Sequence, residues 1–246
     1  MVEQGRDTGV EEPLMNLDLI TDNLDFFLLG TFLEDGRPGG LLLTLLMSVS
    51  AGVIASALGV FGGIALIMGD VRLRQLLEGT IALLRAIPVV MMIFWCYFLL
   101  PILFHLNITG VTTVVAALSI IYGAYLSHSM RAGLAAVSAG QWQAGLALGL
   151  TRWQTLRLIV LPQALRMMLP SFINQWVTLT KDTSLAFIVG VPELTMVAGQ
   201  VNNREQVYPL QIYLAVGLFY FVSCSGLSYL AQRLSQPSGR TPVPSC

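Results

Sequence analysis

A lysine and an aspartate stand side by side within a strongly apolar part of this chain. The segment reads TLTKDTSLAFIVG (residues 178–190), and Lys181 is the only lysine in the sequence. Charged groups at membrane depth usually face a pathway or pair with one another. If this segment lies in a membrane, the Lys181 ammonium is a candidate to bind the carboxylate of a transported substrate.

The residues that follow Lys181 predict an irregular helix. Asp182, Thr183 and Ser184 are helix-capping types, so we expect one helix to end near Lys181 and a shorter one to begin with SLAFIVG. Helix breaks at membrane depth are tolerated only where they line a cavity or are buried in protein. One interpretation is that all four residues line a substrate path, with His128 as a further polar residue of that path.

A structural interpretation competes with the first at each position. Lys181 and Asp182 would then hold the bundle together by pairing with other groups, or the lysine would extend outward to the membrane surface. Adjacent residues on a helix do not face each other, which argues against a pair made by these two alone. For His128 the alternative is packing in the core, because the sequence offers it no evident partner.

The composition indicates that a membrane is present. The 246 residues are 55% hydrophobic and 11% charged, whereas soluble domains carry about 25% charged residues. A helix needs about 20 apolar residues to cross the hydrocarbon core. Five stretches qualify: residues 41–69, a second centred on 86–104, 108–127, a less pure one from about 164, and 208–231. The predicted fold class is therefore an all-α polytopic membrane protein with about five transmembrane helices.

Arginine positions predict the orientation, because basic residues favour cytoplasmic loops. Most arginines lie between the first and second stretches, around the connection between the third and fourth, and in the tail. The segment before the first stretch instead carries nine of the 14 acidic residues. We expect the N-terminus outside and the C-terminus in the cytoplasm. The net charge of −1, without a basic patch, gives no support for nucleic-acid binding.

The chain divides into three parts. Residues 1–40 mix Leu, Phe and Ile with Asp and Asn, which is typical of an amphipathic segment on the outer membrane surface; a poorly ordered tail is the alternative for residues 1–13. The acidic N-terminus does not resemble a cleaved signal peptide. Residues 41–234 form the transmembrane domain and 235–246 a cytoplasmic tail. The three cysteines show neither disulfide nor metal-ligand spacing, so no metal site is predicted.

The connection between the third and fourth stretches, residues 138–162, carries the strongest local signals. Ser138 and Gln141 fit a capping box, which places a helix start at Ala139. Gly149 fits a helix stop in the left-handed conformation. The helix between these signals, AGQWQAGLAL, has no charged residue. It is suited to docking in a groove of a partner protein, or alternatively to packing back on its own bundle.

A second short helix is expected directly after the first. Thr151 and Gln154 repeat the capping-box pattern. Pro162 is then expected to interrupt the helix before the fourth span, because proline lacks the N–H that the helix interior needs.

The residues of this connection resemble a known motif. Permeases of ABC importers carry Glu-Ala-Ala, three residues, Gly, nine residues and Ile-x-Leu-Pro in this loop. Here Gln143, Ala144 and Gly145 are followed by Gly149 and by the Ile-Val-Leu-Pro run that ends at Pro162, with matching spacing throughout. The chain departs from the motif at Gln143, where the family usually has Glu, and at Gly145, where it usually has Ala.

Flanking segments are similar to the polar amino-acid uptake branch of this family. LPQALRMMLPSFINQ and KDTSLAFIVGVPEL resemble the branch's segment after the loop. Arg85 and Pro88 resemble the ends of its Arg-Gly-Thr-Pro signature, with Ala86 and Ile87 in place of Gly-Thr. YLSHSMRAG resembles a stretch in which the branch commonly has Glu at the position of His128.

The resemblance implies a permease subunit of a type I ABC importer, similar to glutamate, aspartate and glutamine permeases of the bacterial inner (cytoplasmic) membrane. It implies a second permease subunit, two ATP-binding subunits and an extracytoplasmic amino-acid binding protein as partners. It also implies that a cytoplasmic coupling helix docks on the ATP-binding subunits. The implied coupling residues are Gln141, Trp142, Gln143, Ala144, Gly145, Gly149, Arg152 and Pro162.

The chain itself shows no site for ATP. A P-loop places its lysine after a glycine-rich loop, and Lys181 follows Thr180 without one. We therefore expect a transport subunit that is not an enzyme and has no cofactor, with ATP and Mg²⁺ bound by partner subunits. The alternative is an ion-coupled amino-acid carrier or channel subunit. A membrane enzyme is disfavoured because His105 and His128 are the only histidines and no nucleophile–base arrangement accompanies them.

Overall fold

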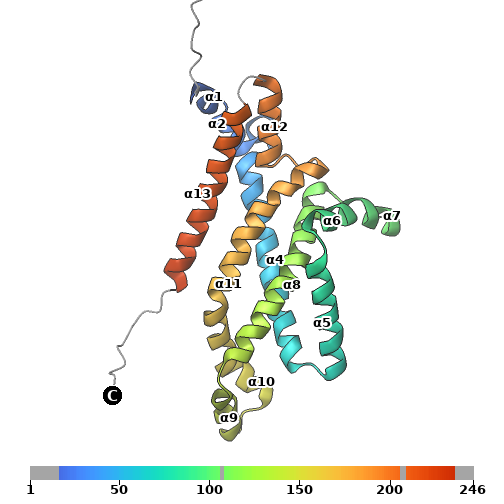
Figure 1. Ribbon diagram of the computed structural model, residues 1–246, viewed down its shortest axis with the longest axis vertical. Coiled ribbons are helices and arrows are strands. Elements are labelled where there is room, and N and C mark those ends of the chain that lie inside the picture. Colours follow the sequence, from blue (N-terminus) through green and yellow to red (C-terminus); the bar gives the residue numbers. More distant parts are fainter. Residues whose placement is uncertain (1–16, 106–107, 206–208, 236–246) are drawn as a thin grey trace, which may run out of the picture.

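A computed structural model of the chain describes residues 17–105, 108–205 and 209–235. The expectations for residues 1–13 and for nearly all of the tail lie outside these ranges. Long helices run along one axis of the molecule, and short helices lie at both ends (Figure 1). The long helices are α4 (Gly40–Met68), α5 (Val71–Ala86), α8 (Gly110–Ala136), α11 (Leu161–Asp182) and α13 (Pro209–Ser235).

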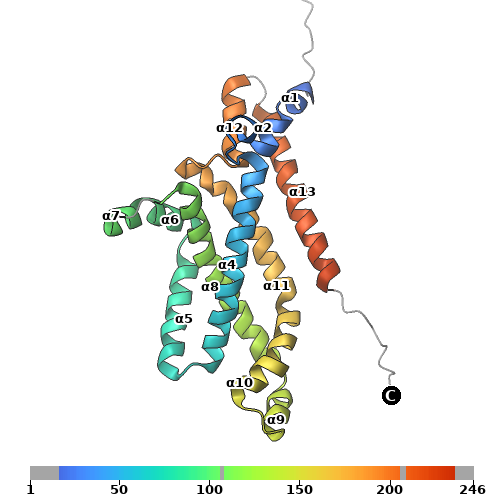
Figure 2. The same cartoon turned by 180° about the vertical axis from the view of Figure 1, so that it is seen from behind.

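The helices confirm the predicted fold class. Four helical stretches are long and apolar enough to cross a membrane, and α5 adds a fifth if it is counted with the helices after its bend. At one end of the bundle lie α1, α2, α3 and α12, and at the other lie α9 and α10 (Figures 1 and 2). Their bounds are α1 Leu17–Asp22, α2 Leu24–Leu29, α3 Phe32–Asp35, α9 Ala139–Ala147, α10 Arg152–Thr155 and α12 Leu194–Glu205. The N-terminal segment and the predicted coupling helix therefore lie at opposite ends, while their sides of the membrane remain a prediction.

The centre of the bundle is the close pair α4 and α8. A Cβ at Gly59 would come 2.4 Å from Cβ of Leu126, and one at Gly63 would come 2.6 Å from Cβ of Met130. Small residues let two helix backbones approach in this way, so these glycines of the first span allow α4 to pack closely against α8.

The second apolar stretch does not follow the predicted path. Instead of one straight helix over residues 86–104, α5 is followed by α6 (Val89–Phe94), the π-helical turn η1 (Trp95–Leu99) and α7 (Leu100–Phe104). The two halves are bent by 101°, and α6 and α7 turn away from the bundle axis (Figure 1). The cause is local: Ile87 is extended, the conformation that a following proline favours.

The fourth span is longer than predicted, and Pro162 does not interrupt it. The helical stretch runs without a gap over Arg152–Val189, 38 residues, through α10, η2, α11 and η3. Pro162 lies in the first turn of α11, directly after the π-helical turn η2 (Leu156–Val160). A wider turn and an N-terminal position both tolerate a residue without an N–H, so the predicted interruption was wrong.

The helix end predicted near Lys181 is present in a milder form. The α-helix α11 ends at Asp182, and the chain continues directly as the 3₁₀ helix η3 (Thr183–Val189). It stops at Gly190, whose φ of 76° is left-handed. The chain therefore tightens at this point and does not break into two separated helices.

Part of the N-terminal segment is anchored to the bundle. Phe27 of α2 is fully buried and packs in one cluster with Leu194 and Val197 of α12 and Ile212 of α13. This cluster fixes α2 and α12 over one end of α4 and α13.

Candidate functional site

Lys181 and Asp182 contact different parts of the bundle. The Tyr122 hydroxyl of α8 donates a hydrogen bond of 2.6 Å to Oδ2 of Asp182, so Asp182 joins α11 to α8. Lys181 is exposed and faces α13 instead. Within residues 17–105, 108–205 and 209–235, the ion pairs present involve Arg74, Glu78 and Arg131, and none includes Lys181. The structural interpretation thus fits Asp182, while the Lys181 ammonium remains available to a ligand.

Lys181 lines a groove between α11 and α13, which we call the lysine groove. Its volume is about 720 Å³. The α13 wall supplies several hydroxyl groups, and α11 supplies Lys181, the one charged group among the described residues that line it. The lining residues are Val177, Lys181, Gly217, Tyr220, Phe221, Cys224, Ser225, Ser228 and Tyr229. One ammonium surrounded by hydroxyls is suited to holding a carboxylate together with other hydrogen-bonding groups.

Thr183 and Ser184 do not line the lysine groove. Thr183 is buried, and its hydroxyl donates to the Thr180 carbonyl oxygen at 2.7 Å. The Thr180 hydroxyl in turn forms a hydrogen bond with the Ser48 hydroxyl of α4. These bonds secure the change from α-helix to 3₁₀ helix against α4, which is a structural role.

His128 lies in a different cavity from Lys181. It is exposed on α8 and lines a cavity of about 200 Å³ between α5 and α8. The same cavity is lined by Glu78, Arg85 and Arg131. The structure therefore does not bring His128 into the lysine groove, although both were candidates for one substrate path.

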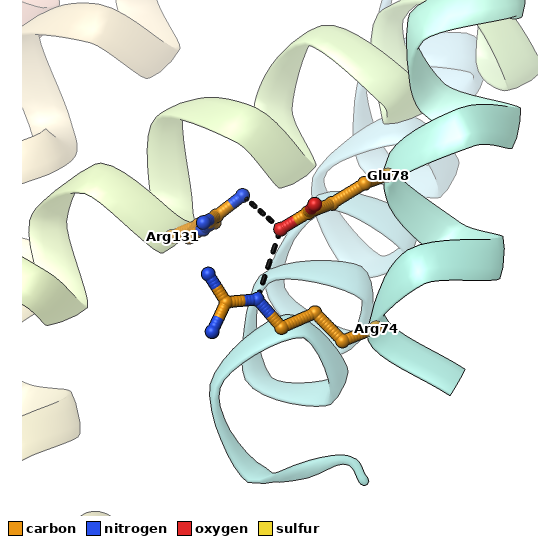
Figure 3. A network of polar contacts seen from close by, with 3 residues as sticks. All are labelled: Arg74, Glu78 and Arg131. Atoms are coloured by element: carbon orange, nitrogen blue, oxygen red, sulfur yellow. Dashed lines mark hydrogen bonds and ion pairs between the residues drawn. The ribbon is translucent and has the colours of Figure 1, made fainter. Parts of the chain in front are cut away.

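A charge network that the sequence analysis did not single out adjoins this cavity. Glu78 Oε1 lies 2.6 Å from Nη1 of Arg131 and 2.9 Å from Nε of Arg74 (Figure 3). The Arg74–Glu78 pair could have been predicted from the sequence, because residues four apart on one helix lie on the same face. The pairing with Arg131 is a tertiary contact between α5 and α8.

The coupling loop follows two of its three predicted capping signals. Gly149 has φ +79°, the Leu150 N–H donates to the Gly145 carbonyl oxygen at 3.1 Å, and the Gly149 N–H donates to that of Leu146 at 3.0 Å. This pair of bonds is a Schellman motif. The Thr151 and Gln154 capping box is also confirmed, with both reciprocal bonds present.

The capping box predicted at Ser138 is not formed. Helix α9 begins at Ala139 as expected, but the Ser138 side chain makes no capping bond. The Gln141 side chain is directed elsewhere: its Oε1 accepts a hydrogen bond of 3.4 Å from Nε2 of Gln163 on α11. The contact with α11 replaces the local cap.

The coupling helix α9 has an inner and an outer side. Gly145 is buried, and Trp142 is half-buried against the core cluster that contains Met130 and Leu156. On α9 the exposed residues include Gln141, Gln143, Ala144 and Leu146, and the later loop residues Gly149, Arg152 and Pro162 are exposed as well. A cavity of about 510 Å³ beside α9 is lined in part by Trp142, Gln143, Leu146 and Arg152. Packing on the bundle is thus present on the inner side of α9, and docking of its exposed side on a partner stays a prediction.

Comparison with known proteins gives this geometry its context. Residues 55–240 match the family model described as the binding-protein-dependent transport system inner membrane component. The chain belongs to this family. It is a permease subunit of an amino-acid ABC importer and a multi-pass membrane protein.

Individual relatives of the permease agree with this assignment. It is 36% identical over 198 residues to the glutamine transport system permease protein GlnP of Escherichia coli (strain K12), covering 80% of this chain and 90% of the relative. It is 31% identical over 205 residues to the glutamate/aspartate import permease protein GltK of Escherichia coli O6:H1, covering 80% and 91%. Among solved structures, an amino acid ABC transporter crystallised with histidines matches with a TM-score of 0.72 and 27% identity, covering 80% and 91%.

The permease's departure from the loop motif at Gly145 has a steric cause. A Cβ at this position would lie 2.5 Å from Cγ2 and 2.8 Å from Oγ1 of Thr155. Real Cβ atoms do not approach so closely, so the glycine is what allows α9 to lie against Thr155 of α10.

Glu193 is a further polar centre of the permease that sequence reasoning missed. It is fully buried at the start of α12, and its carboxylate accepts bonds from the N–H groups of Thr195 at 2.9 Å and Met196 at 3.0 Å. The Tyr220 hydroxyl donates a third bond of 3.0 Å. Burial raises the pKa of Glu193 to about 7, against the opposing effect of these bonds. The available signal was an acidic residue after Pro192 at a helix start.

Proposed function

We propose that this permease forms the translocation path for a polar amino acid with an acidic or amide side chain. The names of its relatives support the substrate class, since one is a glutamine and another a glutamate/aspartate permease. An extracytoplasmic binding protein would deliver the substrate, as the description of the matching family suggests.

One observation carries the proposed path. Lys181 is the only lysine of the chain, and it is exposed on a helical stretch that is apolar enough to cross a membrane. Exposed polar residues recur along the same side of α11 at helical spacing, namely Asn174, Thr178 and Lys181. Polar side chains on a spanning helix need protein or water around them. This side of α11 would therefore line the path, and Lys181 would bind the substrate carboxylate.

The same proposal assigns a role to the opposite end of the bundle. Helix α9 exposes Gln143, Ala144 and Leu146, and this uncharged side would dock in a groove on an ATP-binding subunit. Two such subunits would bind ATP and Mg²⁺, and a second permease would complete the path. In this arrangement residues 1–40 lie on the extracytoplasmic side of the bacterial inner membrane. Residues 41–234 form the transmembrane domain of the permease, and residues 235–246 form a cytoplasmic tail.

The test is uptake into proteoliposomes that contain the permease, its ATP-binding subunits and an added binding protein. Labelled glutamine, glutamate and aspartate are compared with leucine. Lys181→Met keeps much of the side-chain length but removes the charge, so uptake is expected to be lost. Lys181→Arg should keep part of it, because a guanidinium is a cation of different shape.

Two controls separate loss of function from loss of fold. Arg204→Gln removes one positive charge from α12, where the arginine lies over the Phe26 ring and outside the lysine groove, and it should transport normally. Adding Asp182→Asn to Lys181→Met should not restore uptake, because Asp182 bonds to Tyr122. Full uptake by a well-folded Lys181→Met permease would refute the role of Lys181 in the path.

A further inference from the structure

Helix α5 lies on the flank of the bundle opposite α13 (Figures 1 and 2), and two arginines line a cavity between α5 and α8. The cavity of about 200 Å³ between α5 and α8 has apolar walls from Leu66 and Ile81. Its polar lining consists of Glu78, Arg85, His128 and Arg131. None of these residues lines the lysine groove, so the two sites are separate.

The charges at this cavity do not balance. Among the described residues Glu78 is the only carboxylate lining it, and both Arg131 and Arg74 are bonded to that carboxylate. Arg85 is a third arginine, and in the described part of the chain it takes part in no ion pair. Arg74 does not line the cavity, so the two lining arginines against one carboxylate leave one positive charge uncompensated there. Uncompensated positive charge on membrane-spanning helices is energetically costly unless an anion or water lies against it.

The two arginines lining the cavity are held in position. The Arg85 guanidinium lies over the Tyr125 ring at 5.2 Å from its centroid, a favourable cation–π distance. Arg131 is held by Glu78 through one nitrogen, Nη1, and its side chain keeps 28% of its surface exposed. Both therefore keep N–H groups for another ligand. Planar guanidinium groups match the oxygens of a phosphate with paired hydrogen bonds.

The surface around the cavity indicates where such a phosphate comes from. Leu73, Leu76 and Leu83 of α5 are exposed, with 42%, 68% and 64% of their surface accessible. Helical spacing places them on the side of α5 turned away from the cavity, where they offer acyl chains an apolar surface on the same helix. Arg131 lies close to the end of α8 at Ala136, toward the end of the bundle that carries α9. Basic pockets between spanning helices on the cytoplasmic side are known to suit anionic lipid headgroups.

We propose that the cavity between α5 and α8 is a phosphate-binding site, in which Arg85 and Arg131 bind the phosphate oxygens and His128 contributes a hydrogen bond. The shared chemistry is a phosphate oxyanion, which an anionic phospholipid or free phosphate would supply. The position of Arg131 near the end of α8 favours the phospholipid, because basic pockets between spanning helices suit anionic lipid headgroups.

Native mass spectrometry of the purified, delipidated permease complex tests the site. The probes are phosphatidylglycerol, diacylglycerol with the same acyl chains, and inorganic phosphate. Phosphatidylglycerol should bind the unchanged complex, and diacylglycerol should bind much more weakly. Arg85→Gln should weaken phosphatidylglycerol binding about tenfold, the effect of losing a hydrogen bond to a charged group. Arg72→Gln is the matched control, because Arg72 is exposed on α5 and does not line the cavity.

A variant with the opposite expected effect distinguishes loss of the binding site from misfolding of the protein. Glu78→Gln removes the competing carboxylate and releases Arg131, so it should bind phosphatidylglycerol more tightly. Binding of inorganic phosphate that depends on Arg85, without binding of phosphatidylglycerol, would also support the site and assign it to free phosphate. Equal phosphatidylglycerol binding by the unchanged complex, Arg85→Gln and Glu78→Gln, with no Arg85-dependent phosphate binding, would overturn the proposal. An equal loss in Arg72→Gln would overturn it as well.

Discussion

Tyr220 connects the lysine groove to the buried carboxylate of Glu193. Its ring lines the groove beside Lys181, and its hydroxyl donates a hydrogen bond of 3.0 Å to Glu193 Oε2. The neighbouring Leu194 N–H donates to the Thr44 hydroxyl at 3.2 Å. One short chain of contacts therefore joins α13, α12 and the start of α4.

Tyr220→Phe should weaken this junction. The variant keeps the ring in the groove but removes one of the three donors to a buried carboxylate, which costs about 1–3 kcal/mol. Thermal unfolding of the purified permease should shift to lower temperature, and uptake should fall with it. Tyr213→Phe is the control, because Tyr213 is exposed on α13 with 49% of its surface accessible. Equal unfolding temperatures for the two variants would contradict the role of the bond.

Glu193 should make the stability of the permease depend on pH. Its pKa is raised from the ordinary 4.5 to about 7, so the folded state holds this proton more tightly than the unfolded state. The resulting stability is fully present below about pH 4.5 and is lost as the pH rises through about 7. Glu193→Gln stays neutral throughout. The unfolding temperature of the unchanged permease should therefore fall relative to that of Glu193→Gln between pH 5 and pH 8. A gap that stays constant or changes in the opposite direction would refute the shift.

Gly145→Ala should disturb the packing of α9 on α10. The added methyl group would overlap the Thr155 side chain, and overpacking of this kind costs about 1–3 kcal/mol. Co-purification with an ATP-binding subunit should decrease, and Thr155→Ala in the same chain should restore it at least in part. Gly140→Ala is the control, because a Cβ there meets nothing within 4 Å. No difference between Gly145→Ala and Gly140→Ala would show that the contact is unimportant.

Gly149→Glu should separate ATP hydrolysis from uptake. A Cβ at Gly149 has open space, so the effect comes from the left-handed backbone at φ +79° and from a new charge beside α9. We expect normal membrane insertion with little uptake, measured together with ATP hydrolysis in proteoliposomes. Gly149→Asn, which tolerates this conformation better, should keep more activity. Normal uptake by Gly149→Glu would argue against a coupling role for the loop.

The orientation can be checked by cysteine labelling in intact cells, after replacement of the native cysteines. A cysteine at Gln141, exposed on α9, should react with an impermeant reagent only after the membrane is opened. A cysteine at Leu33, which has 69% of its surface exposed on α3, should react without that step. Reaction at Gln141 in intact cells would reverse the proposed topology.

Local signals in the sequence predicted local structure well. The left-handed stop at Gly149 and the capping box of Thr151 and Gln154 depend on groups within a few residues of each other, and both are present. The two prolines show where such reasoning fails. Pro88 accompanies a bend of 101°, whereas Pro162 is accommodated in a continuous helix after a π-helical turn. Hydropathy does not distinguish the two prolines, because both lie in or beside segments that are apolar enough to be predicted as spans.

The candidate site was predictable only in part, for a similar reason. Lys181 stood out because a charge in an apolar stretch needs an explanation. Its separation from Asp182 depends on Tyr122, and its groove depends on α13 residues such as Tyr220 and Ser228. These partners are far away in the sequence, and no periodicity within one segment identifies them.

The unbroken helical stretch over Arg152–Val189 has a mechanical consequence. Its 38 residues reach roughly 57 Å at about 1.5 Å per residue, from the capping box beside α9 to the end of η3 beyond Lys181. At its Arg152 end, the Gln141–Gln163 bond and the Gly145–Thr155 contact clamp α9 to it. The stretch contains two places at which helices bend, the π-helical turn η2 and Pro170 inside α11. If α9 docks on an ATP-binding subunit as proposed, its movement would reach Lys181 and the hydroxyls of α13 through a continuous helix with defined bending points.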